Sequence, residues 1–287
     1  MTVLYQLATP LPEAERNARL YRGELIVFRS FDAMAQLTDK LRAHCFSHLG
    51  NDPTRAHQSM SPIKIEHASE ALRTAVRNDS DVDLAWRQVL SELHTDLDDT
   101  YGDGTFIRVQ PPRSGEEGER TGPLRAHRDT WGSNLPAQIN WWTPLYDTTP
   151  ERTLALFPGY FTQIIENDSA DWNFQEMVRA YRAKNAPDYP LLPTATKVPC
   201  WEDALVVSLL PGDLLCFSGA HLHASVPNTT RLTRLSFETR TVNRSDMSAG
   251  SGAPNVDGSA PFMTPQIFRH LLNGQRLGEL ALVSPTR

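Results

Sequence analysis

The chain has 287 residues, of which 40% are hydrophobic and 22% are charged, proportions typical of a globular protein with a full core. Its 28 basic and 34 acidic residues give a net charge of −6 without a basic block, which argues against binding to nucleic acid or to an anionic membrane. No apolar run is long enough to span a bilayer, no secretory leader is recognisable, and the three cysteines form no CxxC pair. We therefore expect a cytoplasmic protein without a disulfide framework or a cysteine-based zinc site.

The first hundred residues are expected to contain one strand and two helices. Residues 24–28 are rich in β-branched and aromatic side chains, which predicts a strand. Ser30 can cap a helix after it, whose apolar stripe is Met34, Leu37, Leu41 and Cys45. A second helix is expected after the turn at residues 78–81, because apolar side chains recur at helical spacing at Val82, Trp86, Val89, Leu90, Leu93 and Leu97.

The pattern changes at Thr105, after which short β-rich runs alternate with turns. The runs are residues 106–109, 137–142, 153–157, 205–210, 214–217 and 234–242. Proline and glycine punctuate them, as in Pro158-Gly159 and Pro211-Gly212-Asp213. Many short strands with frequent turns predict a mainly β core, either a sandwich or a barrel, with the helices flanking it.

Several segments are expected to interrupt or follow these strands. Residues 113–122 are charged and rich in glycine, and residues 166–201 include a possible helix at 173–184; both resemble lids. Residues 245–261 are rich in Ser, Gly and Ala and are expected to form a mobile loop. A last helix is predicted at 264–272, ended by Gly274.

We expect the whole chain, residues 1–287, to be one domain. Residues 1–104 would pack on the core, residues 105–242 would form it, and residues 243–287 would add a loop and a helix. The chain contains no internal repeat that would suggest a different division.

Two His-x-Asp triplets are candidate metal-binding motifs. His94 and Asp96 are expected to lie on the second helix, where positions i and i+2 point in nearly opposite directions and cannot easily hold one ion. His127 and Asp129 lie in the β-rich part, where positions i and i+2 of a strand project from one face. The second triplet is therefore the candidate.

A third ligand is available in His221-Leu222-His223, which follows the expected strand at 214–217. Two imidazoles and one carboxylate make the facial triad of non-haem Fe(II) oxygenases, which leaves coordination positions open. Zinc with two His and one acid is an alternative, but such enzymes also need a general base, and no HExxH motif supplies one.

Three arginines, Arg231, Arg234 and Arg240, follow on the next expected strand. An arginine inside a barrel needs an anion, and the planar guanidinium suits a carboxylate. A cosubstrate with two carboxylates would fit, with one end on the metal and the other on arginine. Arg240 could equally pair with Glu238 on the same strand face or contact a second anion, and Arg231 is expected in a surface turn.

The order of these motifs resembles that of the Fe(II)/2-oxoglutarate-dependent dioxygenases, and within them it is most similar to the phytanoyl-CoA dioxygenase-like group. The resemblance covers residues 106–242 and rests on His127-x-Asp129, Trp142-x-Pro144-Leu145, Phe157-Pro158-Gly159, Pro211-Gly212-Asp213, His223-x-Ser225-x-Pro227-Asn228 and Arg234. In this group the distal histidine is followed by an asparagine at +5 and an arginine at about +11, spacings that His223 meets and His221 does not. One departure is Tyr160, since the family often continues from Pro-Gly into Ser-His.

The resemblance implies a double-stranded β-helix, the cupin-like jelly roll, with Fe(II) held by His127, Asp129 and His223 and 2-oxoglutarate anchored by Arg234. It implies an oxidoreductase that converts 2-oxoglutarate and O2 to succinate and CO2 while it hydroxylates a small molecule in natural-product or specialised metabolism. Related enzymes desaturate, cyclise or epimerise instead. Halogenation is not expected, because halogenases of the superfamily replace the carboxylate that Asp129 provides.

Four further residues are candidates for substrate or metal binding. Arg108 and Trp131 are expected to contact substrate because they lie near the first ligand motif, although aromatic residues in strands more often belong to the core. His44 and His48 have the i, i+4 spacing of a zinc site but border an apolar stripe. A binding protein without redox activity and a zinc hydrolase remain alternatives, although neither needs the anion anchor that Arg234 offers. The sequence does not indicate an oligomeric state.

Overall fold

The computed structural model describes residues 4–29, 31–115, 118, 120–182 and 189–279. Within these residues the strands form two sheets. The larger is eight-stranded, with the order β1-β2-β8-β5-β10-β3-β11 and with β4 paired to β10 beside β3. The smaller is three-stranded, with the order β7-β6-β9. The mainly β core with flanking helices is thus confirmed.

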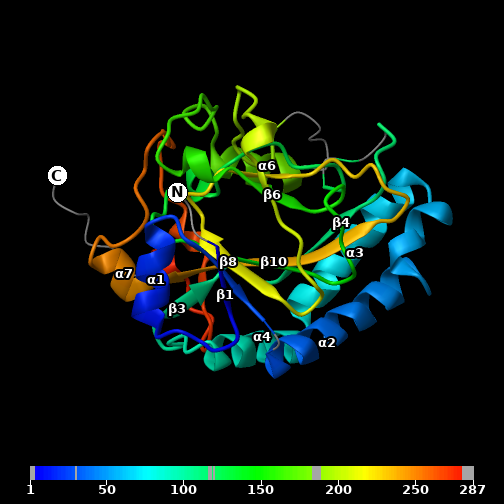
Figure 1. Cartoon of the computed structure of the whole chain (residues 1–287), viewed down its shortest axis with the longest axis horizontal. Helices are drawn as coiled ribbons and strands as arrows, with labels where there is room; N and C mark the ends of the chain where they lie inside the picture. The colour runs from blue at the N-terminus through cyan, green and yellow to red at the C-terminus, as the bar shows by residue number, and fades with distance from the viewer. Residues whose placement is uncertain (1–3, 30, 116–117, 119, 183–188, 280–287) are drawn as a thin grey trace.

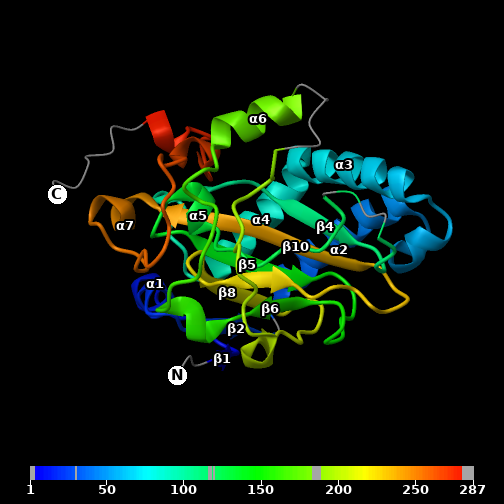
Figure 2. The same cartoon turned by 90° about the horizontal axis from the view of Figure 1, so that it is seen from above.

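The strands of the large sheet come from both ends of the chain. They are β1 (Leu4–Leu7), β2 (Leu25–Phe28), β3 (Thr100–Gly102), β4 (Phe106–Gln110), β5 (Ile139–Pro144), β8 (Leu214–Ser218), β10 (Arg234–Asn243) and β11 (Arg269–His270). Figure 2 shows β8, β5 and β10 side by side, in agreement with the antiparallel pairing of β5 to both neighbours. The small sheet consists of β6 (Leu154–Leu156), β7 (Leu205–Val206) and β9 (His223–Ser225). Six of the expected β-rich runs are therefore strands, although the run at 205–210 pairs only at its first two residues.

Three helices cover one side of the large sheet: α2 (Asp32–Leu49), α3 (Pro62–Asn78) and α4 (Ser80–Glu92). Figure 1 shows them on the side away from β6. The ring of Trp86, on α4, packs against Trp141 of β5 and Phe237 of β10, with ring centroids 5.7 and 5.4 Å apart. The helix α4 therefore packs directly on strands β5 and β10.

The remaining helices are shorter. They are α1 (Glu13–Tyr21), α5 (Thr130–Ser133), α6 (Phe174–Arg182) and α7 (Arg244–Ser248), with 3-10 turns at Pro53–Gln58, Pro158–Phe161, Trp201–Asp203, Pro265–Ile267 and Leu277–Glu279. The helix predicted at 173–184 is confirmed as α6 up to Arg182, and its last two residues lie outside the described residues. Ser30, the expected cap of α2, also lies outside them.

Two expectations for helices are wrong. The segment at 264–272 makes only one 3-10 turn and then the strand β11, because Phe268 is buried and the next two residues pair with Tyr101 and Gly102 of β3. The helix α4 ends at Glu92, so Leu97, His94 and Asp96 lie beyond it. His94 adopts a left-handed conformation with φ of 58°, in the position where a chain leaves a helix.

The Pro-Gly-Asp motif makes the turn into β8. The amide of Asp213 donates to the carbonyl of Leu210 at 3.0 Å, and Gly212 has φ of 93°, a left-handed value that a side chain would disfavour. Asp213 then pairs with Arg29 after β2 (Nη1 to Oδ2, 2.7 Å). The motif thus fixes where β8 begins beside β2.

Candidate metal centre

His127 and His223 lie opposite each other in a short backbone bridge. Each amide donates to the carbonyl of the other residue at 2.9 Å, and the two rings have centroids 4.2 Å apart. Asp129 follows in a helical conformation (φ −63°, ψ −31°) at the start of α5. The expectation that His127 and Asp129 share the face of a regular strand is therefore wrong, since a turn rather than strand alternation directs the carboxylate to the histidines.

The three side chains converge. Nε2 of His127 is 3.9 Å from one carboxylate oxygen of Asp129, and Nε2 of His223 is 3.8 Å from the other. Their candidate ligand atoms all lie within 4.8 Å of one another, the arrangement that a metal ion needs. His221 does not belong to this cluster: it is fully buried, with its ring 4.6 Å from that of Phe161. The choice of His223 over His221 thus agrees with the geometry.

The hydrogen bonds of the two histidine rings are made by Nδ1, so Nε2 is the candidate metal-binding nitrogen of each ring. Nδ1 of His127 lies 2.8 Å from the carbonyl of Arg125, and Nδ1 of His223 lies 2.9 Å from that of His221. Since a carbonyl can only accept, each Nδ1 carries a proton, and Nε2 is the ring nitrogen of each histidine that faces the cluster. Burial and the neighbouring His223 also lower the pKa of His127 to about 3, so its ring is neutral at physiological pH.

Asp129 is held as a carboxylate. Burial alone would raise its pKa, but Arg240, the two histidines and Asn140 outweigh burial and lower the pKa to about 2. Nε of Arg240 is 3.4 Å from Oδ1, and the amide of Asn140 donates to Oδ2. Two imidazoles and one carboxylate are the donor set of a non-haem Fe(II) site, so the residues fit that ion.

Arg240 is an ion-pair residue in this structure. It bonds to Asp103 with its amide (2.9 Å) and with Nη1 (2.7 Å), as well as lying beside Asp129. Burial works against its charge, but the two carboxylates outweigh burial and raise its pKa. The sequence offered no signal for Asp103, which stands between two glycines far from Arg240 along the chain.

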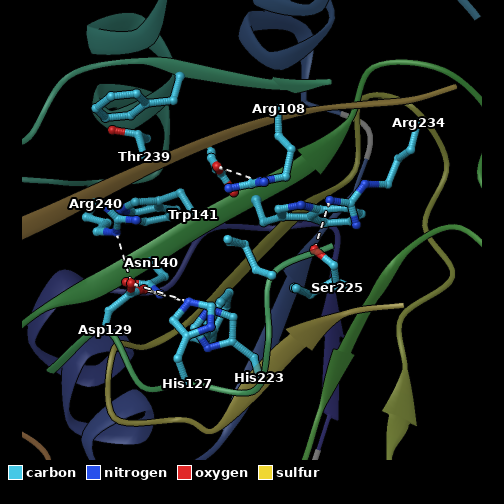
Figure 3. Close-up of a pocket in the computed structure, with 16 residues that line it drawn as sticks. Arg108, His127, Asp129, Asn140, Trp141, His223, Ser225, Arg234, Thr239 and Arg240 are labelled. Carbon is cyan, nitrogen blue, oxygen red and sulfur yellow. Dashed lines mark hydrogen bonds and ion pairs between the residues drawn. The ribbon is translucent and has the colours of Figure 1, made fainter. Parts of the chain in front are cut away.

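Arg234 lies at the other end of the same cavity. Figure 3 shows its guanidinium near Ser225 and Arg108, across the cavity from the three metal-ligand candidates. Nη1 donates to the carbonyl of Thr153 at 2.7 Å and Nη2 to Ser225 at 3.4 Å, but Nε has no hydrogen-bond partner among the described residues. Arg234 is 2% exposed, and in the part of the chain that the structure describes no carboxylate lies at salt-bridge distance from it.

The charge of Arg234 is therefore poorly solvated. Burial, together with the nearby Arg108, lowers its pKa to about 9. A guanidinium remains protonated at neutral pH even so, and the lowered pKa means that an anion placed beside it would be stabilised. Asn228 holds the turn between His223 and Arg234. Its side-chain amide donates to the carbonyls of Gln110 (3.1 Å) and of Leu232 (2.7 Å), which lies just before β10.

Of the other candidates from the sequence, only Arg108 lines the cavity. Arg108 lines the cavity and lies 3.4 Å from Glu238 (Nε to Oε1). Trp131 does not line it: the side chain is fully buried, and its indole nitrogen donates to Asp257 at 2.7 Å. Among the described residues, neither His44, which bonds to Asp79 at 2.7 Å, nor His48 belongs to a metal-ligand cluster. Arg231 is exposed, as expected.

A family model described as phytanoyl-CoA dioxygenase matches residues 22–236, which include every residue of the metal cluster and Arg234. The chain belongs to the phytanoyl-CoA dioxygenase family. This family consists of non-haem oxygenases that depend on 2-oxoglutarate, so the chain is identified as an enzyme of that class. No curated protein sequence matches this family member significantly.

Solved structures resemble the family member at low sequence identity. EvdO2 from Micromonospora carbonacea var. aurantiaca is 14% identical, over 90% of this chain and 99% of that one, with a TM-score of 0.51, and supports the fold. The 2-oxoglutarate-dependent carbocyclase SnoK from nogalamycin biosynthesis is 18% identical, over 90% and 98%, with a TM-score of 0.41. The epimerase SnoN, in complex with Fe3+, α-ketoglutarate and nogalamycin RO, is 15% identical over the same shares, with a TM-score of 0.44.

Proposed function

We propose that this chain is an Fe(II)- and 2-oxoglutarate-dependent oxygenase that oxidises a small molecule. His127, Asp129 and His223 would hold the iron, and Arg234 would bind the distal carboxylate of 2-oxoglutarate. The observation that carries the proposal is the shared cavity, with an ionised carboxylate and two free Nε2 atoms at one end and a buried, incompletely bonded guanidinium at the other. A dicarboxylate with a metal-chelating end matches both.

Bound iron would supply a Lewis-acid centre with open positions for a keto acid and O2. The described residues supply the remaining requirements. Arg234 and Ser225 would orient the carboxylate, and Asn140 and Arg240 would keep Asp129 ionised and in place. The buried side chains of Phe217 and Trp142 form an apolar part of the cavity wall. Because Asp129 is present, hydroxylation, desaturation, ring closure and epimerisation are all compatible with the site, and halogenation is not.

The finer fold assignment belongs to the same proposal. We infer that the two sheets form the double-stranded β-helix of cupin-like proteins. The basis is the bridge between His127 and His223, which joins the segment between β4 and β5 of the large sheet to β9 of the small sheet. We further infer one domain over residues 1–287, since the aromatic packing of α4 joins the N-terminal part to β5 and β10.

The substrate is proposed to be a small molecule of natural-product or specialised metabolism, by analogy with the family. Arg108 and its partner Glu238 line the cavity and are the proposed substrate contacts. Trp131 has no exposed surface to offer a substrate in this structure. A cytoplasmic location is also proposed, in keeping with three cysteines that are all free. Within the described residues, no helix is both long and apolar enough to cross a bilayer.

The decisive experiment is an anaerobic titration of the Fe(II)-loaded protein with 2-oxoglutarate, followed by visible absorption. A weak charge-transfer band that saturates is expected, and it should disappear in Asp129→Ala. The control is Asp96→Ala, which alters the other His-x-Asp triplet and should leave the band unchanged. Well-folded, iron-loaded protein without a band would contradict the proposal and favour a zinc hydrolase or a binding protein on the same fold.

The reaction type can then be read from product mass. With a panel of candidate small molecules, hydroxylation adds one oxygen atom, desaturation or ring closure removes two hydrogens, and epimerisation leaves the mass unchanged. Each outcome should be accompanied by formation of succinate, which a binding protein or a hydrolase would not produce.

A further inference from the structure

Arg128, the middle residue of the metal motif, joins three separate segments. Its side chain is 2% exposed. Nη1 donates to the carbonyl of Ala220 at 2.5 Å, and Nη2 donates to the carbonyls of Tyr160 at 2.7 Å and Gln163 at 3.0 Å. Ala220 stands just before His221-Leu222-His223. One guanidinium therefore connects the segment that carries His127 and Asp129 to the segment that carries His223.

The acid that balances this guanidinium comes from the loop near the C-terminus. Asp257 is also 2% exposed, and its carboxylate lies 3.0 Å from Nε and 3.1 Å from Nη2 of Arg128. It also accepts hydrogen bonds from the indole N–H of Trp131 at 2.7 Å and from the amide of Ile165 at 3.1 Å. Both carboxylate oxygens are thus fully engaged, which a buried charge requires.

Two residues that donate hydrogen bonds to Asp257 flank Asp129, the candidate metal ligand, in the sequence. Arg128 precedes Asp129 by one residue and Trp131 follows it by two, and both donate to the same carboxylate. The guanidinium also stacks over the Trp131 ring, 5.7 Å from its centroid. The backbone that aims Asp129 at the histidines is therefore held from both sides by one residue of a distant loop.

The net stability that a buried ion pair contributes does not by itself explain the pair between Arg128 and Asp257. A buried ion pair often contributes little net stability, because desolvation of the two charges offsets their attraction. Its effect is geometric, because hydrogen bonds to a fixed carboxylate restrict where the donors can lie. Outer-shell groups that orient metal ligands typically change metal affinity by about 10–100-fold.

The sequence predicts a mobile loop at residues 245–261, the segment that supplies Asp257. The side chain of Asp257 is instead buried, and the backbone carbonyl of this residue accepts a hydrogen bond from Asn167 at 3.0 Å. It lies outside residues 22–236, the part that matches the family model. The acid that pairs with Arg128 thus comes from a segment beyond the match to the family model.

We propose that Asp257 is a positioning residue for the metal centre: through Arg128 and Trp131 it holds Asp129, and the loop that leads to His223, in their metal-binding arrangement. The proposal rests on the proposed function only in assuming that His127, Asp129 and His223 bind a divalent metal. It predicts that the C-terminal loop sets metal affinity and ligand geometry without touching the metal.

The test is a titration of the metal-free full-length chain with Co(II), with the d–d absorption bands as the readout, alongside thermal unfolding. Asp257→Asn removes the charge but keeps a similar shape, and it should raise the Kd for Co(II) about 10–100-fold and alter the bands. The matched control is Asp213→Asn, which breaks the partly buried pair with Arg29 away from the metal cluster. It should lower the Tm and leave the Kd and the bands unchanged.

Two further variants make the test specific. If Asp257 acts through Arg128, then Arg128→Met and the double variant Arg128→Met/Asp257→Asn should have Kd values within about threefold of each other, because coupled residues are not additive. Trp131→Phe removes the indole N–H donor together with part of the ring and alters no charge, so it tests the same link if the charge variants fail to fold, and it should also weaken Co(II) binding.

The outcomes separate the two proposals. Wild-type protein that binds no Co(II) overturns the proposed function as well as this inference. Wild-type protein that binds Co(II), with Asp257→Asn and Trp131→Phe showing a lower Tm but unchanged Kd and bands, overturns only the positioning role and makes Asp257 a structural residue.

Discussion

His127 and His223 are paired through their backbones: each amide donates to the other's carbonyl at 2.9 Å. The hydrogen bonds that bring the two imidazoles together therefore do not involve the imidazole rings. The rings can be removed without breaking this bridge, so metal binding and folding can be tested separately at this site.

The first prediction compares the two histidines of the His221-Leu222-His223 motif. His223→Ala removes a ligand candidate and should abolish Co(II) binding while changing the Tm little, because its backbone bridge to His127 remains. His221→Ala should do the reverse: it should lower the Tm, because a fully buried ring that packs on Phe161 is lost, and keep Co(II) binding within a few fold. Binding that survives in His223→Ala and is lost in His221→Ala would reverse the ligand assignment.

The second prediction concerns the anion anchor. Arg234→Met should raise the Kd for 2-oxoglutarate by about 10–100-fold, because hydrogen bonds to a charged group contribute about 1.5–3 kcal/mol. Fe(II) affinity should not change, since Arg234 lies at the opposite end of the cavity. The control is Arg231→Met, an exposed arginine three residues earlier, which should leave both constants unchanged. Equal effects of the two variants would remove Arg234 from the site.

The third prediction concerns the packing behind the site. Trp86→Ala should lower the free energy of unfolding by about 3–5 kcal/mol, because a 2% exposed indole between Trp141 and Phe237 would leave a cavity. Leu84→Ala, at a 50% exposed position on the same helix, should cost less than about 1 kcal/mol. Urea unfolding measures both, and similar losses for the two variants would contradict the packing of α4 on the sheet.

The fourth prediction concerns cysteine reactivity and its pH dependence. Burial raises the pKa of Cys45 to about 12, and it raises that of Cys216 as well, whereas Cys200 is exposed. Alkylation of the native protein at pH 8 should therefore add one label by intact mass, and none in Cys200→Ser. More than one label on the folded wild type would contradict the burial of these thiols.

The same shift has a consequence for stability. An unfolded thiol loses its proton near pH 9, whereas Cys45 keeps its proton in the folded state up to about pH 12. Its contribution to stability is therefore complete below pH 9 and declines as pH rises toward 12, by about 1.4 kcal/mol for each pH unit. Cys45→Ala should show a shallower loss of unfolding free energy over this range than the wild type, as measured by urea unfolding at fixed pH values.

Local sequence patterns predicted the strands β2, β4, β5, β6, β7, β8 and β10, but not β1, β3, β9 or β11. The β-rich runs became strands because alternation and turn residues act over a few positions. The helix α3 was not predicted, because its buried stripe of Ile65, Ser69, Leu72 and Val76 is interrupted by a polar residue. The strand β11 was mistaken for a helix, since pairing with β3, far away in the sequence, decides its conformation.

The sequence by itself predicted the family and the proposed ligand types, from the His-x-Asp motif, the distal His223 and the spacing to Arg234. The tertiary structure decided which groups support them. Arg240 pairs with Asp103, which is 137 residues away in the sequence, and Arg128 pairs with Asp257, which is 129 residues away. A buried charge must find a partner somewhere, but neither spacing nor periodicity indicates which one, because long-range pairing depends on how the sheets and loops pack.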